Sequence, residues 1–532
     1  MEGTPATARK KRRRSESAYM LSGMSSNSST LRASQRVVML GLDGLSWEFL
    51  QAPLVRETMP GIAALLERSA TGDLTSTIPP YTGPAWTTIT TGLGPGKHGA
   101  FGFTDRDGRP VSDTRIAVPR VWDYVGHAGG RSIVVNVPLT YPARPIEGLL
   151  VSGMPAPAQE RYTHPEDLAA RLDTLAGGYV IDEPVLGSPK IASAAERLRA
   201  MTEKRGKAAA ALARDGSWDL FAIVFVLPDR LGHPWWKYLV PGATLYDTRQ
   251  GDRVRETMRP VLRALDDAVS SFLDALPAGT AVLTCSDHGF GPLRADIFFD
   301  VALAEAGLIE GVKGRKVLRV AGRMARTTAG RFVPRSLLDR TKKALGDGGE
   351  RRAWTAPKYE GAIRLHDPTD AGLRKEVTQV LEGLRSPEGE PVVATVYARE
   401  DIHEGDYTTE APELFPQMAS EDVELHEGLH AGSFWVPRED VAWGTHRRKG
   451  IVAIDGGPAA SRVIDGHVTD ITPTLLALLG LATEEPLDGS SLVVGENLEP
   501  VGSPATRGPS EAYSEEDEAA VMEHLKGLGY VE

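Results

Sequence analysis

The chain has 532 residues, of which 41% are hydrophobic and 25% are charged, and its formal net charge is −11. These values are ordinary for a globular protein with an ample core, and no apolar stretch reaches the length of a membrane-spanning helix. A single cysteine, Cys285, excludes an intramolecular disulfide and a thiolate-rich zinc site, and the acidic charge argues against general nucleic-acid binding.

Residues 1–34 form a predicted disordered, basic leader. Positions 9–14 read RKKRRR, and the polar, serine-rich run that follows has too few apolar residues to build a core. A secretory or twin-arginine signal needs an apolar run after the basic residues, and this sequence does not provide one. We therefore expect a cytoplasmic protein whose folded part begins near residue 35.

The first predicted strand covers residues 36–42, RVVMLGL, and ends at Asp43 and Gly44. A continuous apolar run of this length is typical of a buried parallel strand, and it delivers Asp43 at the carboxyl end, where open α/β sheets place their sites. An Asp-Gly pair after a strand is also a common turn, so Asp43 becomes a site candidate only together with other residues. A helix is predicted over residues 59–70 from the spacing of its apolar residues.

The segment PYTGPAWTTITTG places the hydroxyl of Thr82 beside a predicted helix start. Pro84 suits the first turn of a helix and Gly92 can end it, so Thr82 lies at or just before the positive end. Backbone N–H groups there favour an anion, which would stabilise both an ionised hydroxyl and a phosphoryl group attacked by it. Thr82 is therefore the candidate nucleophile, although threonine is also an ordinary capping residue.

Two later predicted strands also end in potential metal ligands. WDLFAIVFVL leads into Asp229 and His233, which can converge on one cation if the intervening turn is tight. AVLTCSDHGFG contains Asp287 and His288, whose burial would require partners. With the apolar runs SIVVNVPL and GLLVSGM, these strands alternate with helices and predict a doubly wound, mostly parallel α/β sheet.

Residues 291–440 do not continue this alternation of strands and helices. They are predicted to form a large inserted cap between core segments 35–290 and 441–500. Residues 313–352 carry 13 lysines and arginines against three acids. Such a run is either a solvated helical face or a positive field that draws an anionic substrate toward the site.

A zinc-protease-like motif, HEGLH, lies at residues 426–430 within the insertion. That motif needs a helix to bring both imidazoles to one face. Gly428 weakens a helix, and the neighbouring VEL and SFWV favour a strand. We therefore do not interpret it as a protease site.

The core resumes at residues 443–450, WGTHRRKG, where His446 is the remaining ligand candidate. The strand IVAI and the helix DITPTLLALLG follow it. Residues 501–532 form a tail that ends in a predicted amphipathic docking helix. Its apolar stripe consists of Val521, Met522, Leu525 and Leu528.

The ordered set of motifs resembles the alkaline phosphatase superfamily, specifically its type I phosphodiesterase and nucleotide pyrophosphatase branch. The resembling motifs are GLDG, TGPAWTTITTGLGPGKHG, PDRLGH, SDHGF, GTHRRKG and DITPTLLALLG. The resemblance implies a sheet of alkaline-phosphatase type and two divalent metal ions, zinc by preference with manganese as the alternative. It assigns one metal to Asp229, His233 and His446, and the other to Asp43, Asp287, His288 and the oxygen of Thr82.

The activity implied by this resemblance is hydrolysis of a phosphodiester or pyrophosphate bond through a covalent phospho-threonine on Thr82. A phosphomutase or a phosphomonoesterase would use the same metal pair, so both stay open. A sulfatase resembling this branch needs cysteine or serine as nucleophile and arginine two residues after the proline, where this chain has Thr82 and Trp86. A non-catalytic binding module is expected to lose metal ligands, and all six are present here.

One departure from the branch concerns substrate choice. Its well-described members carry an asparagine after the nucleophile that hydrogen-bonds a phosphoryl oxygen, and this chain has Phe103 and Thr104 at that place. The expected partner is therefore only a small anionic phosphate ester, with no nucleic acid and no membrane span. The resemblance sets neither the natural substrate nor the oligomeric state.

Overall fold

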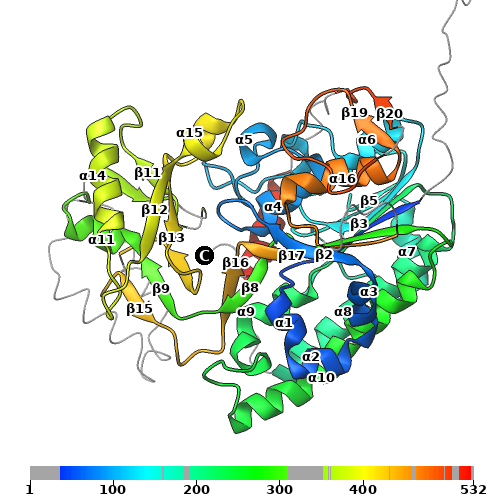
Figure 1. Ribbon diagram of the computed structural model, residues 1–532, viewed down its shortest axis with the longest axis horizontal. Coiled ribbons are helices and arrows are strands. Elements are labelled where there is room, and N and C mark those ends of the chain that lie inside the picture. The colour runs from blue at the N-terminus through cyan, green and yellow to red at the C-terminus, as the bar shows by residue number, and fades with distance from the viewer. Residues whose placement is uncertain are drawn as a thin grey trace, which may run out of the picture.

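A nine-stranded sheet forms the centre of the larger of two lobes (Figure 1). The computed structural model describes residues 36–157, 161–184, 191–309, 351–356, 359, 361–429, 432–456, 463–495, 498–505 and 514–528. In spatial order the strands of this sheet are β18 (Gly466–His467), β2 (Ala70–Thr75), β17 (Lys449–Asp455), β7 (Ala281–Cys285), β1 (Val37–Leu42), β6 (Leu220–Phe225), β3 (Ser132–Val137), β4 (Gly148–Ser152) and β5 (Thr163–His164).

The middle of the sheet is parallel. Strand β1 lies between β7 and β6, and Val37 pairs with Ala281 on one side and Leu220 on the other. Every residue of these three strands is buried, as expected for continuous apolar runs covered on both faces. Antiparallel pairs occur toward the edges, between β17 and both β7 and β2, and between β4 and β5. The predicted doubly wound, mostly parallel α/β sheet is confirmed.

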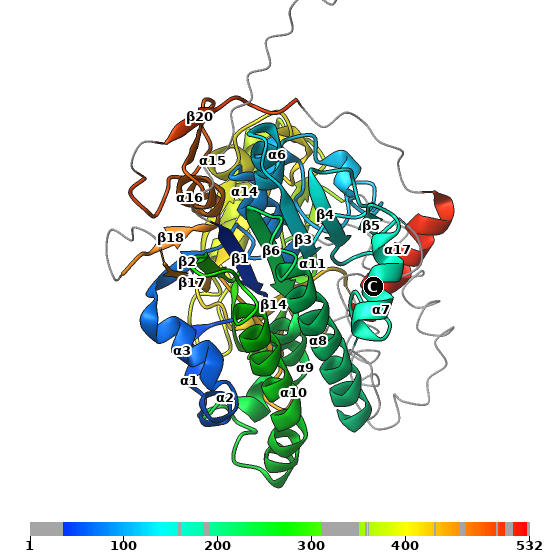
Figure 2. The same ribbon diagram turned by 90° about the vertical axis from the view of Figure 1, so that its right-hand side faces the viewer.

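Helices cover both faces of the sheet, and Figures 1 and 2 show α8 and α10 against one face and α6 and α16 against the other. On the α10 side are α1 (Trp47–Gln51), α2 (Pro53–Thr58), α3 (Pro60–Arg68), α7 (Leu168–Ala176), α8 (Ile191–Ala213), α9 (Leu227–Leu239) and α10 (Arg249–Leu273). On the α16 side are α4 (Thr82–Thr91), α5 (Pro95–His98), α6 (Val121–His127), η4 (Val468–Asp470) and α16 (Ile471–Leu478), with the small strand pair β19 (Leu481–Thr483) and β20 (Glu499–Val501).

The smaller lobe, at the left of Figure 1, has two short sheets and its own hydrophobic cluster, which includes Ile297, Leu303, Val377 and Leu381. One sheet contains β10 (Ala353–Thr355), β11 (Ile363–Leu365), β13 (Leu414–Met418) and β12 (Val393–Ala398). The other contains β14 (Val423–His426), β9 (Ala295–Phe298) and β15 (Trp435–Pro437). The helices are α11 (Phe299–Glu305), α14 (Ala371–Glu382), α15 (Arg399–Ile402) and η3 (Thr408–Glu410).

These elements fall within the predicted insertion, and its exact limits, 291 and 440, stay a prediction. The basic leader, His430 and residues 310–350 of the basic run lie outside the described residues. Among the helices that are described, none combines the length and the apolar character that a bilayer crossing requires.

The C-terminal helix α17 (Glu515–Leu528) docks on the larger lobe through Val521 and Leu525, which are fully buried. Their cluster includes Tyr81 and Phe103, two aromatic residues that pack edge to face with ring centroids 5.3 Å apart. A second anchor is polar, because Asp517 accepts hydrogen bonds from the Tyr141 hydroxyl at 2.9 Å and from Arg161 at 2.6 Å.

Candidate active site

Three adjacent strand ends supply the carboxylates of the site. Asp43 follows β1, Asp287 follows β7, and Asp229 lies in the first turn of α9 directly after β6. Two hydrogen bonds from backbone N–H groups connect these residues. The Asp229 N–H donates to the Asp43 carbonyl at 3.0 Å, and the Gly44 N–H donates to Asp287 Oδ1 at 3.2 Å. Gly44 has φ of 70°, and a Cβ there would lie 3.1 Å from the Asp229 backbone, so the turn after Asp43 requires glycine.

Helix α4 brings Thr82 to these strand ends. The helix begins at Thr82, with Tyr81 as its N-cap, and ends at Thr91. Gly92 ends the helix as predicted, and its φ of 70° is the left-handed conformation common at helix C-termini. The helix therefore starts two residues before Pro84, which the first turn tolerates. Thr82 is fully buried, and its Oγ1 lies 3.2 Å from His288 Nε2. One turn later, Trp86 Nε1 donates to Asp43 Oδ2 at 3.0 Å.

His233 and His446 reach the same point from different elements. The predicted tight turn between Asp229 and His233 is in fact helix α9, and their spacing of four residues puts both side chains on one face. Gly232 allows close packing, because a Cβ there would lie 2.7 Å from Phe290. His446 lies on β16 (Gly444–Arg447), which pairs antiparallel with β8 (Gly289–Pro292) and thereby stacks His446 on His288 with ring centroids 3.8 Å apart.

All seven residues predicted from the sequence meet in one buried cluster. Asp229 Oδ1 lies 3.3 Å from His233 Nε2 and 3.4 Å from His446 Nε2. His288 Nε2 lies 3.3 Å from Asp287 Oδ2 and 3.7 Å from Asp43 Oδ1. The His233 side chain is 18% exposed, whereas those of Asp43, Asp229, Asp287 and His288 are at most 2% exposed, so the cluster meets solvent on the His233 side.

Burial of so many ionisable groups shifts their pKa values in opposite directions. Burial, reinforced by neighbouring carboxylates, raises the pKa of Asp43 and of Asp287 well above the ordinary value. Burial also lowers the pKa of His288 well below its ordinary value, with His446 adding to the effect. For Asp229, burial alone would raise the pKa, but His233, His446 and Arg230 outweigh it and lower it. Ionising all three carboxylates together would concentrate negative charge in this buried cluster, and a bound cation would balance that charge.

The donor atoms of the cluster fit divalent cations. His446 Nδ1 lies 2.9 Å from the Pro80 carbonyl and His288 Nδ1 lies 3.0 Å from the Gly289 carbonyl. A carbonyl only accepts, so each Nδ1 carries the proton and each Nε2 presents a lone pair to the cluster. Within the part of the chain that is described, Asp43 Oδ1 and Asp287 Oδ2 are buried atoms with no hydrogen-bond donor. Carboxylate oxygens and imidazole nitrogens in this arrangement are the ligands of zinc and related metals.

Within this cluster, two groups of three donors, which share Asp229, are each compact enough to hold an ion, with the ligand atoms of each group within 4.8 Å of one another. The first, Asp229, His233 and His446, coincides with one predicted metal site. The second contains Asp43 and His288 with Asp229, where the prediction has Asp287 as third ligand. Asp229 therefore belongs to both groups. Asp287 belongs to neither, although its Oδ2 lies 3.3 Å from His288 Nε2, and its role as a ligand stays a prediction.

Sequence reasoning missed two residues that hold Asp229. Arg230 donates through Nη1 to Asp229 Oδ2, while Asp182 accepts from Arg230 Nε at 3.2 Å and from Nη2 at 2.6 Å. All three side chains are at most 4% exposed. Arg230 stands inside the recognised motif PDRLGH and could have been found by its adjacency to Asp229. Asp182 precedes α8 in an irregular segment with no local pattern to single it out.

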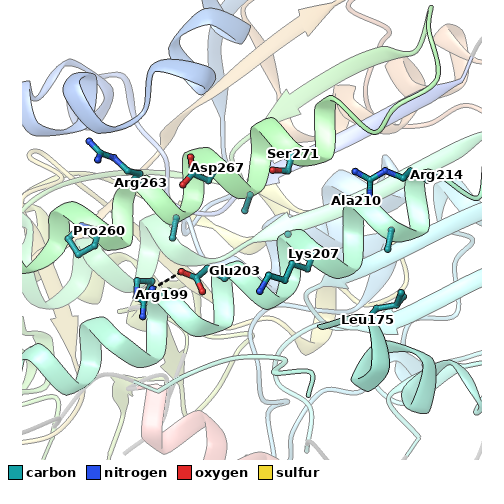
Figure 3. A pocket seen from close by; sticks show the side chains of 14 residues that line it. Leu175, Arg199, Glu203, Lys207, Ala210, Arg214, Pro260, Arg263, Asp267 and Ser271 are labelled. Carbon is teal, nitrogen blue, oxygen red and sulfur yellow. Dashed lines mark hydrogen bonds and ion pairs between the residues drawn. The ribbon is translucent and has the colours of Figure 1, made fainter. Parts of the chain in front are cut away.

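A surface hollow of about 610 Å³ lies between α8 and α10 and contains none of the predicted site residues (Figure 3). Its floor is formed by small residues, and a Cβ on Gly206 would lie 2.5 Å from Ala268, which shows how closely the two helices approach. Arg199 on its rim is paired with Glu203 at 2.8 Å. The hollow therefore reflects helix packing and does not extend the active site.

The fold and the buried donor cluster define the class of protein: an α/β protein of alkaline-phosphatase type with a metal-binding-capable centre at the strand ends. The chain belongs to the type I phosphodiesterase/nucleotide pyrophosphatase family, whose sequence profile matches residues 37–415. This family membership makes the protein a hydrolase of phosphate esters and confirms the resemblance seen in the motifs.

Comparison with solved structures agrees with the fold. Phosphonoacetate hydrolase from Sinorhizobium meliloti 1021 in complex with phosphonoformate has 16% sequence identity and a TM-score of 0.53, over 82% of this chain and 94% of that chain. The same hydrolase in complex with phosphonoacetate has a TM-score of 0.52 over the same shares, also at 16% identity. Human ectonucleotide pyrophosphatase/phosphodiesterase 5 has 16% identity and a TM-score of 0.46, over 86% of this chain and 97% of that chain. Comparison with curated proteins gives no significant match.

Proposed function

We propose that the protein is a two-metal hydrolase that cleaves a phosphodiester or pyrophosphate bond through a covalent phospho-threonine on Thr82. The observation that carries this proposal is the position of the Thr82 hydroxyl at the first residue of α4, 3.2 Å from His288 Nε2 and inside the carboxylate cluster. The orphaned oxygens of Asp43 and Asp287 support metal binding beside that hydroxyl.

The residues that would hold one cation are Asp229, His233 and His446, and those for the other are Asp43, Asp287 and His288 with the Thr82 oxygen. When bound, zinc or manganese ions lower the pKa of a coordinated hydroxyl and stabilise charge on the attacking and leaving oxygens. The protein supplies the positioning, because Trp86 fixes Asp43 and Arg230 fixes Asp229 so that each carboxylate keeps one oxygen turned to the cluster.

The chemistry of Thr82 then follows in two displacements. Oγ1 loses its proton and forms a bond to phosphorus while the bond from phosphorus to the leaving oxygen breaks, and the leaving oxygen takes up one proton. A water molecule next attacks the phosphorus, the bond to Oγ1 breaks, and a proton of that water passes to Thr82. The start of α4 lies at the attacked group, where its first backbone N–H groups favour the charge on the phosphoryl oxygens. The substrate is a small phosphate ester, and a cytoplasmic location stays a prediction.

A substrate panel tests the proposal. Protein loaded with Zn²⁺ or Mn²⁺ is assayed on bis-aryl diesters, nucleotides, glycerophosphodiesters and aryl monoesters, with chelated protein and His446→Ala as controls. We expect metal-dependent cleavage of at least one diester or pyrophosphate in preference to the monoester. Preference for monoesters would favour a phosphomonoesterase. In a separate incubation with phosphosugars, their interconversion without phosphate release would favour a phosphomutase. Loaded protein that cleaves no substrate of the panel would point to a binding module.

A further inference from the structure

His426, the first histidine of the HEGLH motif, belongs to a different cluster from the one that this motif suggests. It is the last residue of β14, and Gly428 two residues later has φ of 92°, so the described part of the motif is not helical. His430 lies outside the described residues. His426 instead lies beside Asp296 and Glu424, and the ligand atoms of these three side chains are within 4.8 Å of one another.

Strand pairing explains why the three side chains converge. Strands β14 and β9 are parallel, with Glu424 opposite Asp296 and His426 opposite Phe298. Alternate residues of a strand point to the same face, so Asp296, Glu424 and His426 share one face of the small sheet. The His426 ring stacks on Phe298 with centroids 5.2 Å apart and planes at 21°, which orients Nε2 toward Asp296 Oδ1 at 3.3 Å.

Each of the three residues presents a buried atom without a hydrogen-bond partner among the described residues: Asp296 Oδ1, Glu424 Oε2 and His426 Nε2. Leaving three such atoms unsatisfied is costly, and their convergence means that one group could satisfy all of them. The other oxygen of Asp296 accepts from Arg438 at 2.5 Å, which holds the carboxylate in this orientation. Asp43 Oδ1 and Asp287 Oδ2 have the same signature in the active site.

We propose that Asp296, Glu424 and His426 bind a third divalent cation, of the zinc or manganese type, in the smaller lobe. Two carboxylate oxygens and one imidazole nitrogen are a suitable donor set for such an ion. With Arg438 alongside and His426 neutral, the cluster keeps one net negative charge for the cation to balance. The site shares no ligand with the catalytic groups, and it joins two strands that are distant in the chain, so it stabilises the lobe.

The competing interpretation is a proton in place of the metal. Burial would lower the pKa of His426, but Asp296 and Glu424 outweigh burial and raise it. An imidazolium could bridge the two carboxylates without any ion. The two interpretations differ in metal content, which is therefore the quantity to measure.

The test counts zinc ions per full-length chain by elemental analysis after loading with Zn²⁺ and desalting. Wild type should hold one more ion per chain than His426→Ala or Glu424→Gln, and calorimetric titration with Zn²⁺ should show at least a roughly tenfold weaker site in these variants. The matched controls His366→Ala and Glu382→Gln remove an exposed imidazole and an exposed carboxylate of the same lobe, and should leave the count unchanged.

Equal zinc content in wild type, His426→Ala and Glu424→Gln, with unchanged circular dichroism, would overturn the proposal. If His426→Ala fails to fold, the isosteric Glu424→Gln decides. The same difference of one ion is expected in a His446→Ala background, so the result does not depend on the proposed catalytic metals. Loss of the difference in that background alone would mean that the ion belongs to the catalytic cluster, which also overturns the proposal.

Discussion

Arg230 distributes its guanidinium between two buried carboxylates, Asp229 and Asp182, and this sharing decides which Asp229 oxygen faces the cluster. Because Asp229 Oδ2 is engaged by Arg230, Oδ1 is turned toward His233 and His446. Outer partners of this kind orient metal ligands and typically change affinity by about 10–100-fold when removed. At the residue scale, Asp182 is therefore a positioning residue for the site.

Asp182→Asn should weaken Zn²⁺ binding at the site of Asp229, His233 and His446 by about 10–100-fold, because Arg230 loses one of its two anionic partners and no longer fixes the orientation of Asp229. Calorimetric titration of the metal-free protein measures this. Asp215→Asn, which removes an exposed partner of Arg171, is the matched control and should bind zinc as wild type does. Unchanged affinity in Asp182→Asn would show that Asp229 is oriented without this pair.

Helix α17 stabilises the region around the start of α4, which carries Thr82. Leu525 is fully buried in the cluster that contains Tyr81, the cap of α4 and the neighbour of Thr82. Leu525→Ala should lower the free energy of unfolding of this region by about 2–5 kcal/mol and increase hydrogen exchange in α17 and at the start of α4. The exposed neighbour Lys526→Ala is the control. If hydrogen exchange became faster in α17 but stayed unchanged at the start of α4, α17 would not support the site.

A second contact between elements predicts a pH effect. His403, which follows α15 in the smaller lobe, packs edge to face against Phe101 of the larger lobe and Phe415 of β13, and its ring nitrogens have no hydrogen-bond partner among the described residues. Burial lowers the pKa of His403 from 6.5 to about 4. In the unfolded chain His403 is protonated below about pH 6.5, whereas in the folded protein it stays neutral down to about pH 4. The free energy of unfolding therefore falls as pH decreases through this window.

Wild type should accordingly lose stability relative to His403→Phe between pH 6.5 and 4, by an amount on the order of 3 kcal/mol for the full shift. Urea denaturation of both proteins at pH 7 and pH 5 gives the free energy of unfolding at each pH. The change in this free energy between the two pH values is then compared between the proteins, so that the contributions of the other histidines cancel. His366→Phe, at an exposed position of the same lobe, should follow wild type. Parallel pH dependence in wild type and His403→Phe would contradict a buried neutral imidazole.

At the scale of the whole molecule, the parts that the sequence predicted best are those determined by local patterns. Continuous apolar runs followed by Asp43, Asp229 or Asp287 identified the central parallel strands and their ends, and these are all buried. The position of antiparallel β17 between β2 and β7 joins segments far apart in the chain, and no local pattern specifies it. In the smaller lobe, strands such as β12 and β14 are mostly half-buried and have no continuous apolar run, so the sequence signal for them is weak.

The residues of the two candidate metal centres likewise divide into those that local motifs predict and those that only the folded structure identifies. Thr82, His233 and His446 stand in recognisable motifs, whereas Asp182 and Asp296 acquire their roles only through pairing with Arg230 and with β14. The ligand set stays a prediction until metals are measured.

The proposed reaction requires a covalent phosphoryl group on Thr82 during turnover, and an acid quench during the reaction traps this intermediate. Peptide mass spectrometry of the quenched, metal-loaded protein should find a peptide from the start of α4 in which Thr82 carries the phosphoryl group together with the ester substituent that the first displacement leaves on phosphorus. Thr82→Ala should give no such peptide and no turnover even at saturating Zn²⁺, and the buried Thr88→Val should retain both peptide and turnover. Near wild-type turnover by Thr82→Ala, or the substrate's phosphoryl group found on another residue of the quenched protein, would contradict the assignment of Thr82 as nucleophile.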